Sequence, residues 1–144
     1  MIPASGRVIG LDWGTTRIGI AITDETQLVA RPLDTLKRRT GRRFPLARFV
    51  TIVAREKPVG LVVGLPLDDD GREADSARAA RKMGVMCAAR TDLPLEWVDE
   101  SFTTARTIET MIEMSRRVDA RKVDPLAAAR LLQEWLDARR DGRG

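Results

Sequence analysis

The chain contains no histidine, one cysteine, no tyrosine and only three phenylalanines and three tryptophans in 144 residues. Without histidine it cannot form a Ser-His-Asp or Cys-His catalytic arrangement, or a zinc site of the usual His and Cys ligands. Any chemistry must therefore use carboxylates, lysine or a hard metal ion. The scarcity of aromatic side chains also argues against recognition of single strands by base stacking.

No apolar run approaches the roughly 20 residues that span a bilayer, and the first residues lack the pattern of a signal peptide. The single cysteine, Cys87, excludes an internal disulfide and is consistent with a reducing cytoplasm. Because Cys87 lies in an alanine-rich, helix-like stretch, we interpret it as a small core residue rather than a nucleophile. We expect a cytoplasmic protein that does not contact a membrane.

Arginine and lysine are clustered, although the formal net charge is only +4. The clusters lie at 37–43, 116–122 and 139–140. Clustered cations are typical of surfaces that bind nucleic acid, and a solvated basic surface without a partner is the alternative. We expect nucleic acid as the partner, contacted through its phosphates rather than its bases.

The hydrophobic pattern predicts one domain over residues 1–144 with a mixed α/β fold. Three strands come first and are expected to be antiparallel; helices and buried, parallel strands then alternate. The strands are predicted at about 7–13, 17–24, 27–36, 59–65 and 95–99, and the helices at about 45–57, 73–91, 103–115 and 125–139.

The run from Arg7 to Asp24 is the most informative segment. Its first strand ends in Asp12, and a Gly-Thr-Thr-Arg turn then leads into the second strand. A carboxylate at a strand end beside exposed backbone N–H groups suits a divalent metal, a phosphate or both. A plain hairpin, in which Asp12 and Gly14 supply only turn geometry, is equally compatible with this segment.

Further carboxylates follow the last strand and precede the last helix. Asp99 and Glu100 close the strand, and Asp124 stands before Pro125. Each has a structural alternative, since Asp124 and Pro125 make a good helix N-terminus and Asp99 or Glu100 could cap a helix. If the first, fourth and fifth strands are parallel neighbours, their carboxyl ends share one edge of the sheet. Three acids at one edge beside a basic surface then favour a metal-dependent phosphodiester site, whereas the acids at 68–70 are interpreted as a solvated turn.

Four ordered motifs resemble the YqgF family, an RNase H-like group described as Holliday-junction-resolvase-like and as nucleases of precursor 16S rRNA. They are the hairpin at 10–24, the segment 62–71, the acidic pair with Ser-Phe-Thr-Thr at 99–104, and the segment 122–128. The resemblance implies an RNase H-like α/β fold: a mixed five-stranded sheet, three antiparallel strands then parallel ones, with helices on both faces. It also implies that Asp12, Glu100 and Asp124 are the catalytic, metal-binding acids.

The expected activity is hydrolysis of phosphodiester bonds in structured nucleic acid, with two Mg²⁺ or Mn²⁺ ions as the cofactor. The resemblance implies processing of the 5′ end of precursor 16S rRNA during ribosome biogenesis. A ribosomal subunit is expected as a further partner, and the chain is expected to be a monomer or a weak homodimer. Arg17 and the backbone N–H groups of Gly14, Thr15 and Thr16 are the candidate contacts to the substrate phosphate. The family usually has lysine at position 16 and arginine at position 101, where this chain has Thr16 and Ser101. We interpret both departures as altered substrate contact rather than lost catalysis.

Three other functions remain open. A Holliday-junction DNA resolvase would share the fold and the acids. A non-catalytic module that binds RNA or ribosomes would bind RNA in a salt-sensitive way that does not depend on Glu100 or Asp124. A sugar kinase or actin-like ATPase has a similar phosphate-binding hairpin, but such proteins bind nucleotide between two related domains and this chain is expected to have one.

Overall fold

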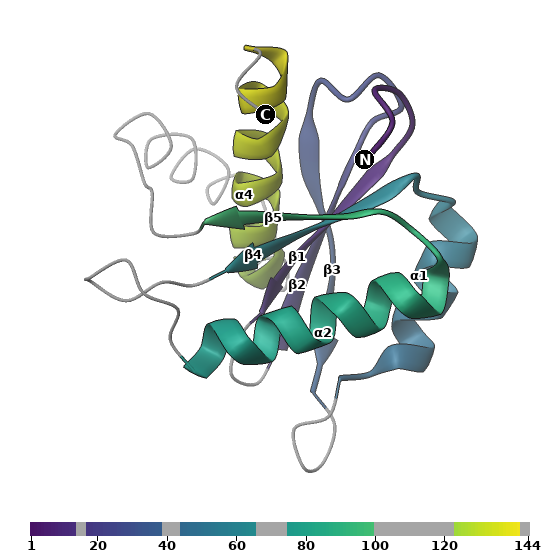
Figure 1. Cartoon of the computed structure of the whole chain (residues 1–144), viewed down its shortest axis with the longest axis vertical. Coiled ribbons are helices and arrows are strands. Elements are labelled where there is room, and N and C mark those ends of the chain that lie inside the picture. Colours follow the sequence, from purple (N-terminus) through teal and green to yellow (C-terminus); the bar gives the residue numbers. More distant parts are fainter. Residues whose placement is uncertain (14–16, 39–43, 66–74, 100–122, 142–144) are drawn as a thin grey trace.

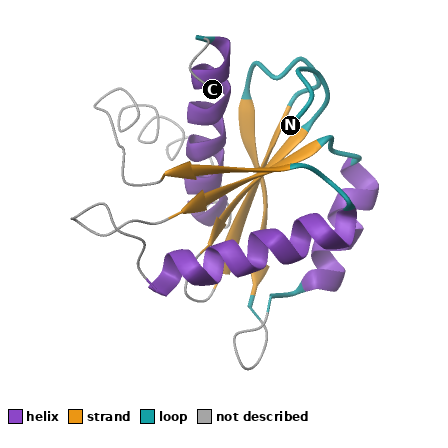
Figure 2. Cartoon of the chain, in the orientation of Figure 1, coloured by secondary structure: helices purple, strands orange, loops and turns teal. Residues whose placement is uncertain are grey.

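Five strands form one twisted sheet, and helices cover both of its faces (Figure 1; Figure 2). The computed structural model describes residues 1–13, 17–38, 44–65, 75–99 and 123–141, with the backbone alone at 75, 76, 123 and 124. No helix within these described ranges is long and apolar enough to cross a membrane.

The strands are β1 (Val8–Trp13), β2 (Arg17–Thr23), β3 (Ala30–Lys37), β4 (Gly60–Leu65) and β5 (Leu95–Asp99). They lie in the sheet in the order β3-β2-β1-β4-β5. The first three strands pair antiparallel, whereas β1, β4 and β5 are parallel neighbours. This arrangement confirms the mixed five-stranded sheet expected from the sequence.

Side-chain alternation along the strands separates two hydrophobic layers. On one face, Ile9 and Leu11 of β1 pack with the buried residues of α1 (Leu46–Glu56) and α2 (Asp75–Thr91). On the other face, Val8 packs against α4 (Val123–Arg140). Every residue of β4 is buried, because this central parallel strand is covered on both sides.

Gly10 sets how closely α4 approaches β1. A Cβ atom built on Gly10 would lie 3.0 Å from the Cβ of Leu132. The Cβ of a helical residue is fixed by the helix backbone, so a side chain at Gly10 would push α4 away from the sheet. The absence of a side chain at this one position therefore determines where the helix lies.

Polar contacts fix α4 along its length. The indole Nε1 of Trp135 donates a 3.2 Å hydrogen bond to Glu96 of β5, and Gln133 Oε1 accepts one of 2.8 Å from the backbone N–H of Ala30. Farther along, the Arg139 guanidinium donates to the carbonyl of Ile2 at 2.7 Å. The helix is thus held to β3, to β5 and to the start of the chain.

One strand boundary predicted from the sequence is wrong: β3 begins at Ala30, not at 27. Asp24 accepts hydrogen bonds from the backbone N–H groups of Leu28 and Val29 and from Thr26, and these bonds lower the pKa of its carboxyl group. Gln27 adopts the left-handed conformation, with φ 59°. The apolar Leu28 and Val29 therefore belong to an Asp-capped turn rather than to the strand. The helix predicted at 103–115 lies outside the described residues.

Candidate active site

The carboxyl ends of β1, β4 and β5 lie at one edge of the sheet, as the sequence predicted. Leu11 pairs with Val63, and Val63 pairs in turn with Trp97, so the three strands run side by side in the same direction. Asp12 follows Leu11 and is half-buried. Asp99 ends β5 opposite Leu65, the last residue of β4. In open α/β sheets this edge is where ligands bind.

The two described acids at this edge are on opposite faces of the sheet. Asp12 is two residues from Gly10 and shares its face, which α4 covers. Asp99 is two residues from Trp97, whose ring lies against Gly84 of α2 on the other face. Asp99 is therefore not positioned as a partner of Asp12. Its neighbour Glu100 lies outside the described residues.

The first turn of α4 lies at the same edge and on the same face as Asp12. The helix runs antiparallel to β1, because Arg139 contacts Ile2 before the strand begins and Leu132 lies against Gly10 within it. Ala128 is one turn before Leu132, and Asp124 is one turn before Ala128, so all three positions share one stripe of the helix. The backbone of Asp124 thus begins the helix beside the end of β1, whereas its side chain is outside the described part.

Basic side chains flank Asp12 on the antiparallel side of the sheet. Arg17 opens β2 and Lys37 ends β3; both are exposed, and the two residues are opposite each other in register. Arg38 follows, with its guanidinium carbon 4.1 Å from the centroid of the Trp13 ring. Arg17 and the basic cluster at 37–43 were both predicted from the sequence. The sequence did not place that cluster beside Asp12; the observed register of the first three strands does.

The backbone N–H groups of Gly14, Thr15 and Thr16, the other predicted phosphate contacts, lie outside the described residues. In the described ranges no three of the Asp, Glu, Cys and His side chains gather closely enough to hold a metal ion. Of the three predicted ligands only Asp12 has a described side chain, so the complete metal site stays a prediction. Carboxylates are hard oxygen donors, and they fit Mg²⁺ or Mn²⁺ better than the softer metals.

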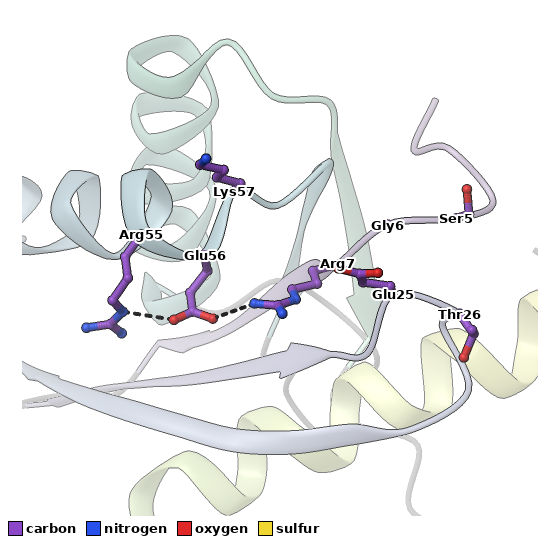
Figure 3. A pocket seen from close by; sticks show the side chains of 8 residues that line it. All are labelled: Ser5, Gly6, Arg7, Glu25, Thr26, Arg55, Glu56 and Lys57. Carbon is purple, nitrogen blue, oxygen red and sulfur yellow. Dashed lines mark hydrogen bonds and ion pairs between the residues drawn. The ribbon is translucent and has the colours of Figure 1, made fainter.

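A separate open hollow of about 690 Å³ lies at the opposite, amino end of β1 (Figure 3). Glu56 binds two cations there: its carboxylate is 3.0 Å from Arg7 and 2.8 Å from Arg55. The hydrogen bond from Arg55, and then the charges of Arg55, Arg7 and Arg31, lower the pKa of Glu56. Arg7 is five residues, or about 16 Å, from Asp12 along the strand. This hollow is thus a remote ion-paired surface, not part of the acidic edge.

Cys87 is not part of any reactive site. The side chain is fully buried in the layer formed with α1 and α2, and burial raises the pKa of its thiol to about 12. A thiol is nucleophilic only as the thiolate. The interpretation of Cys87 as a core residue is confirmed.

Comparison with known proteins decides the family. The model of the RuvX family, described as Holliday junction resolvase, matches residues 6–138. The chain belongs to the RuvX family. The resemblance to YqgF proteins is thereby confirmed, and so is the prediction of a nuclease, at the level of the family.

Curated relatives of this RuvX-family chain cover most of its length. A protein of Anaeromyxobacter sp. (strain Fw109-5) is 43% identical over 136 residues, covering 92% of this chain and 98% of the relative. A protein of Myxococcus xanthus is 37% identical over 136 residues, covering 93% of this chain and 89% of the relative. Both are named as proposed pre-16S rRNA nucleases.

Among solved structures, RuvC of Thermus thermophilus in complex with a Holliday junction substrate has a similar fold. Its TM-score is 0.62 at 20% identity, and the match covers 94% of this chain and 96% of that one. A second structure of RuvC from the same organism matches with a TM-score of 0.59 at 17% identity, and the match again covers 94% of this chain and 96% of that one. At these identities the likeness concerns the fold, and it confirms the RNase H-like architecture.

Proposed function

We propose that this RuvX-family chain is a metal-dependent endonuclease that cleaves structured RNA, and that its substrate is the 5′ region of precursor 16S rRNA. The observation that carries the proposal is the shared edge and face of Asp12 and the first turn of α4, where Asp124 lies. The end of β5, immediately before Glu100, lies at the same edge. The activity would take place in the cytoplasm, with the ribosomal subunit as the further partner.

Asp12, Glu100 and Asp124 are the residues proposed to hold Mg²⁺ or Mn²⁺. Of Asp99 and Glu100, Glu100 is chosen because Asp99, the last residue of β5, is on the face covered by α2. The bound metal would activate water and stabilise the charge that develops on the phosphate oxygens. Asp12 is half-buried near the end of a buried strand, so ordering its side chain on a metal costs less entropy than ordering a fully exposed one.

Arg17 is the proposed contact to the phosphate that is cleaved. It is two residues from Gly19, which pairs with Asp12, and is therefore on the same face one step nearer the edge. Its permanently charged guanidinium can bind two phosphate oxygens at once. The backbone N–H groups of Gly14 to Thr16 are proposed to assist it.

RNA is the first candidate substrate because the relatives at 37% and 43% identity carry the rRNA name over almost the full chain. Branched DNA is the second candidate, supported by the description of the family as Holliday junction resolvase. The RuvC likeness, at 20% identity, bears on the fold and not on the substrate.

The test is cleavage of a transcript that carries the 5′ leader of 16S rRNA, and of a four-way DNA junction, by the purified full chain. We expect cleavage of the transcript with Mg²⁺ or Mn²⁺, none with a chelator, and slower cleavage of the junction. Preferred cleavage of the junction would replace the RNA assignment with a resolvase. Binding of the transcript without metal-dependent cleavage would favour a non-catalytic module instead.

A further inference from the structure

Two cations are opposite each other on neighbouring strands next to the acidic edge. Arg17 of β2 pairs in register with Lys37 of β3. Both side chains are exposed, and both belong to the sheet face of Asp12, because Asp12 pairs with Gly19 and Gly19 with Thr35. From the spacing of strands and residues, the Cα atoms of Asp12 and Lys37 are about 12 Å apart.

This pairing is unfavourable for the sheet alone, because like charges directly opposite each other on antiparallel strands repel. No carboxylate in the described part of the chain forms an ion pair with Lys37. The acidic residue of its own strand, Asp34, pairs instead with Arg48, at 3.6 Å. An anion bound beside Lys37 would reduce this repulsion.

A third cation lies at this edge, on the opposite face of the sheet from Asp12. The Arg38 guanidinium lies over the Trp13 ring, which keeps it beside the end of β1. Three cations at one end of the sheet raise the positive potential there and attract a polyanion.

We propose that Lys37, acting with Arg17, binds a backbone phosphate of the substrate adjacent to the bond that is cleaved. This inference rests on the proposed function and adds a second contact, which extends the path of the nucleic acid from Asp12 across β2 to β3. The contact is to phosphate and carries no sequence information. Lys37 is thus a substrate-binding residue and takes no part in the chemical step.

Binding can be tested without cleavage in the full chain carrying Asp12→Asn. The dissociation constant of the 16S leader transcript is measured at several salt concentrations, with and without Lys37→Gln. The loss of one phosphate contact reduces the slope of log K against log salt by about one. Lys37→Arg should keep the slope, because it keeps the charge.

Lys57→Gln is the matched control, since it removes the same charge from an exposed lysine at the opposite, amino end of β1 (Figure 3). It should leave the slope unchanged. The inference would be overturned if Lys37→Gln left the slope of the Asp12→Asn chain unchanged. It would also be overturned if Lys37→Gln and Lys57→Gln reduced the slope equally. A wild-type chain that fails to cleave would instead refute the proposed nuclease, and the binding experiment would still report on Lys37.

Lys37→Glu separates binding from a structural role. It places an anion opposite Arg17, so the melting temperature should be unchanged or higher while binding becomes weaker than with Lys37→Gln. A lower melting temperature together with unchanged binding would show that Lys37 serves the sheet and not the substrate.

Discussion

Replacing Gly10 with alanine should separate the stability of the fold from the geometry of the acidic edge. The added Cβ would lie 3.0 Å from the Cβ of Leu132 and 3.3 and 3.4 Å from its two methyl groups. The methyl groups can rotate away, but the Cβ of Leu132 moves only with the backbone of α4. The helix must therefore shift by a few tenths of an ångström.

Two opposing effects set the stability change. Overpacking a closely packed layer costs about 1–3 kcal/mol. Replacing glycine in a strand recovers about 0.5–1 kcal/mol of backbone entropy. We expect the free energy of unfolding to fall by about 1–2 kcal/mol, measured by urea denaturation with an unchanged m-value.

Activity should fall by more than this loss of stability explains. Because α4 begins at Asp124 beside the end of β1, a shift of the helix changes the separation of the proposed ligands. Misplacements of about 1 Å can cost about 100-fold in rate, so a smaller shift should cost about tenfold. The assay is cleavage of the 16S leader transcript under conditions in which the variant is fully folded.

Gly84→Ala is the matched control. A Cβ there meets the Trp97 ring at 2.8 Å, but on the sheet face covered by α2. This variant should change stability while the folded protein keeps its cleavage rate. Full activity of folded Gly10→Ala, or an equal loss of activity in Gly84→Ala, would refute the reasoning that α4 positions the site.

Three further predictions concern the rest of the molecule. Trp135→Phe removes the hydrogen bond to Glu96 and should lower the free energy of unfolding by about 1 kcal/mol in urea denaturation; no change would show that this bond does not hold α4. Cys87 should react with a thiol reagent only when the protein unfolds, because the pKa of its buried thiol is about 12; rapid reaction in the native protein would contradict its burial. Asp24→Asn should destabilise the protein at neutral pH. The folded state lowers the pKa of Asp24 below its usual 3.8, so the charged carboxylate stabilises the protein above that pH and this stabilisation is lost as the pH falls. The free energies of unfolding of wild type and Asp24→Asn should therefore become equal in acid. A difference that persists in acid would contradict this prediction.

The order of the strands could be predicted because local patterns determine it. The fully apolar run of β4 indicated a strand covered on both faces, and short turns joined the first three strands into an antiparallel unit. The start of β3 was misplaced because Leu28 and Val29 are apolar yet belong to a turn. The hydrogen bonds of Asp24 determine that turn, and apolar periodicity does not detect them.

The site was predictable only in part. Asp12 was predicted as a site residue because it ends an apolar strand directly before a glycine-containing turn, and the parallel pairing of β1, β4 and β5 confirmed that their carboxyl ends share an edge. The face on which each acid lies required the observed register and the position of α4 over Gly10. The pairing of Lys37 with Arg17 also depends on register, so the sequence showed a basic cluster but not its place beside Asp12.

Asp12, on the face covered by α4, is proposed as a catalytic acid of a metal-dependent nuclease. The most direct test compares Asp12→Asn with Asp99→Asn in single-turnover cleavage of the 16S leader transcript with Mg²⁺. Both substitutions remove one negative charge at the same edge of the sheet, but from opposite faces. We predict that Asp12→Asn lowers the rate by about 100-fold or more, or about 2.7 kcal/mol of transition-state stabilisation, and that Asp99→Asn stays within a fewfold of wild type. Equal rates for Asp12→Asn and wild type would contradict the account.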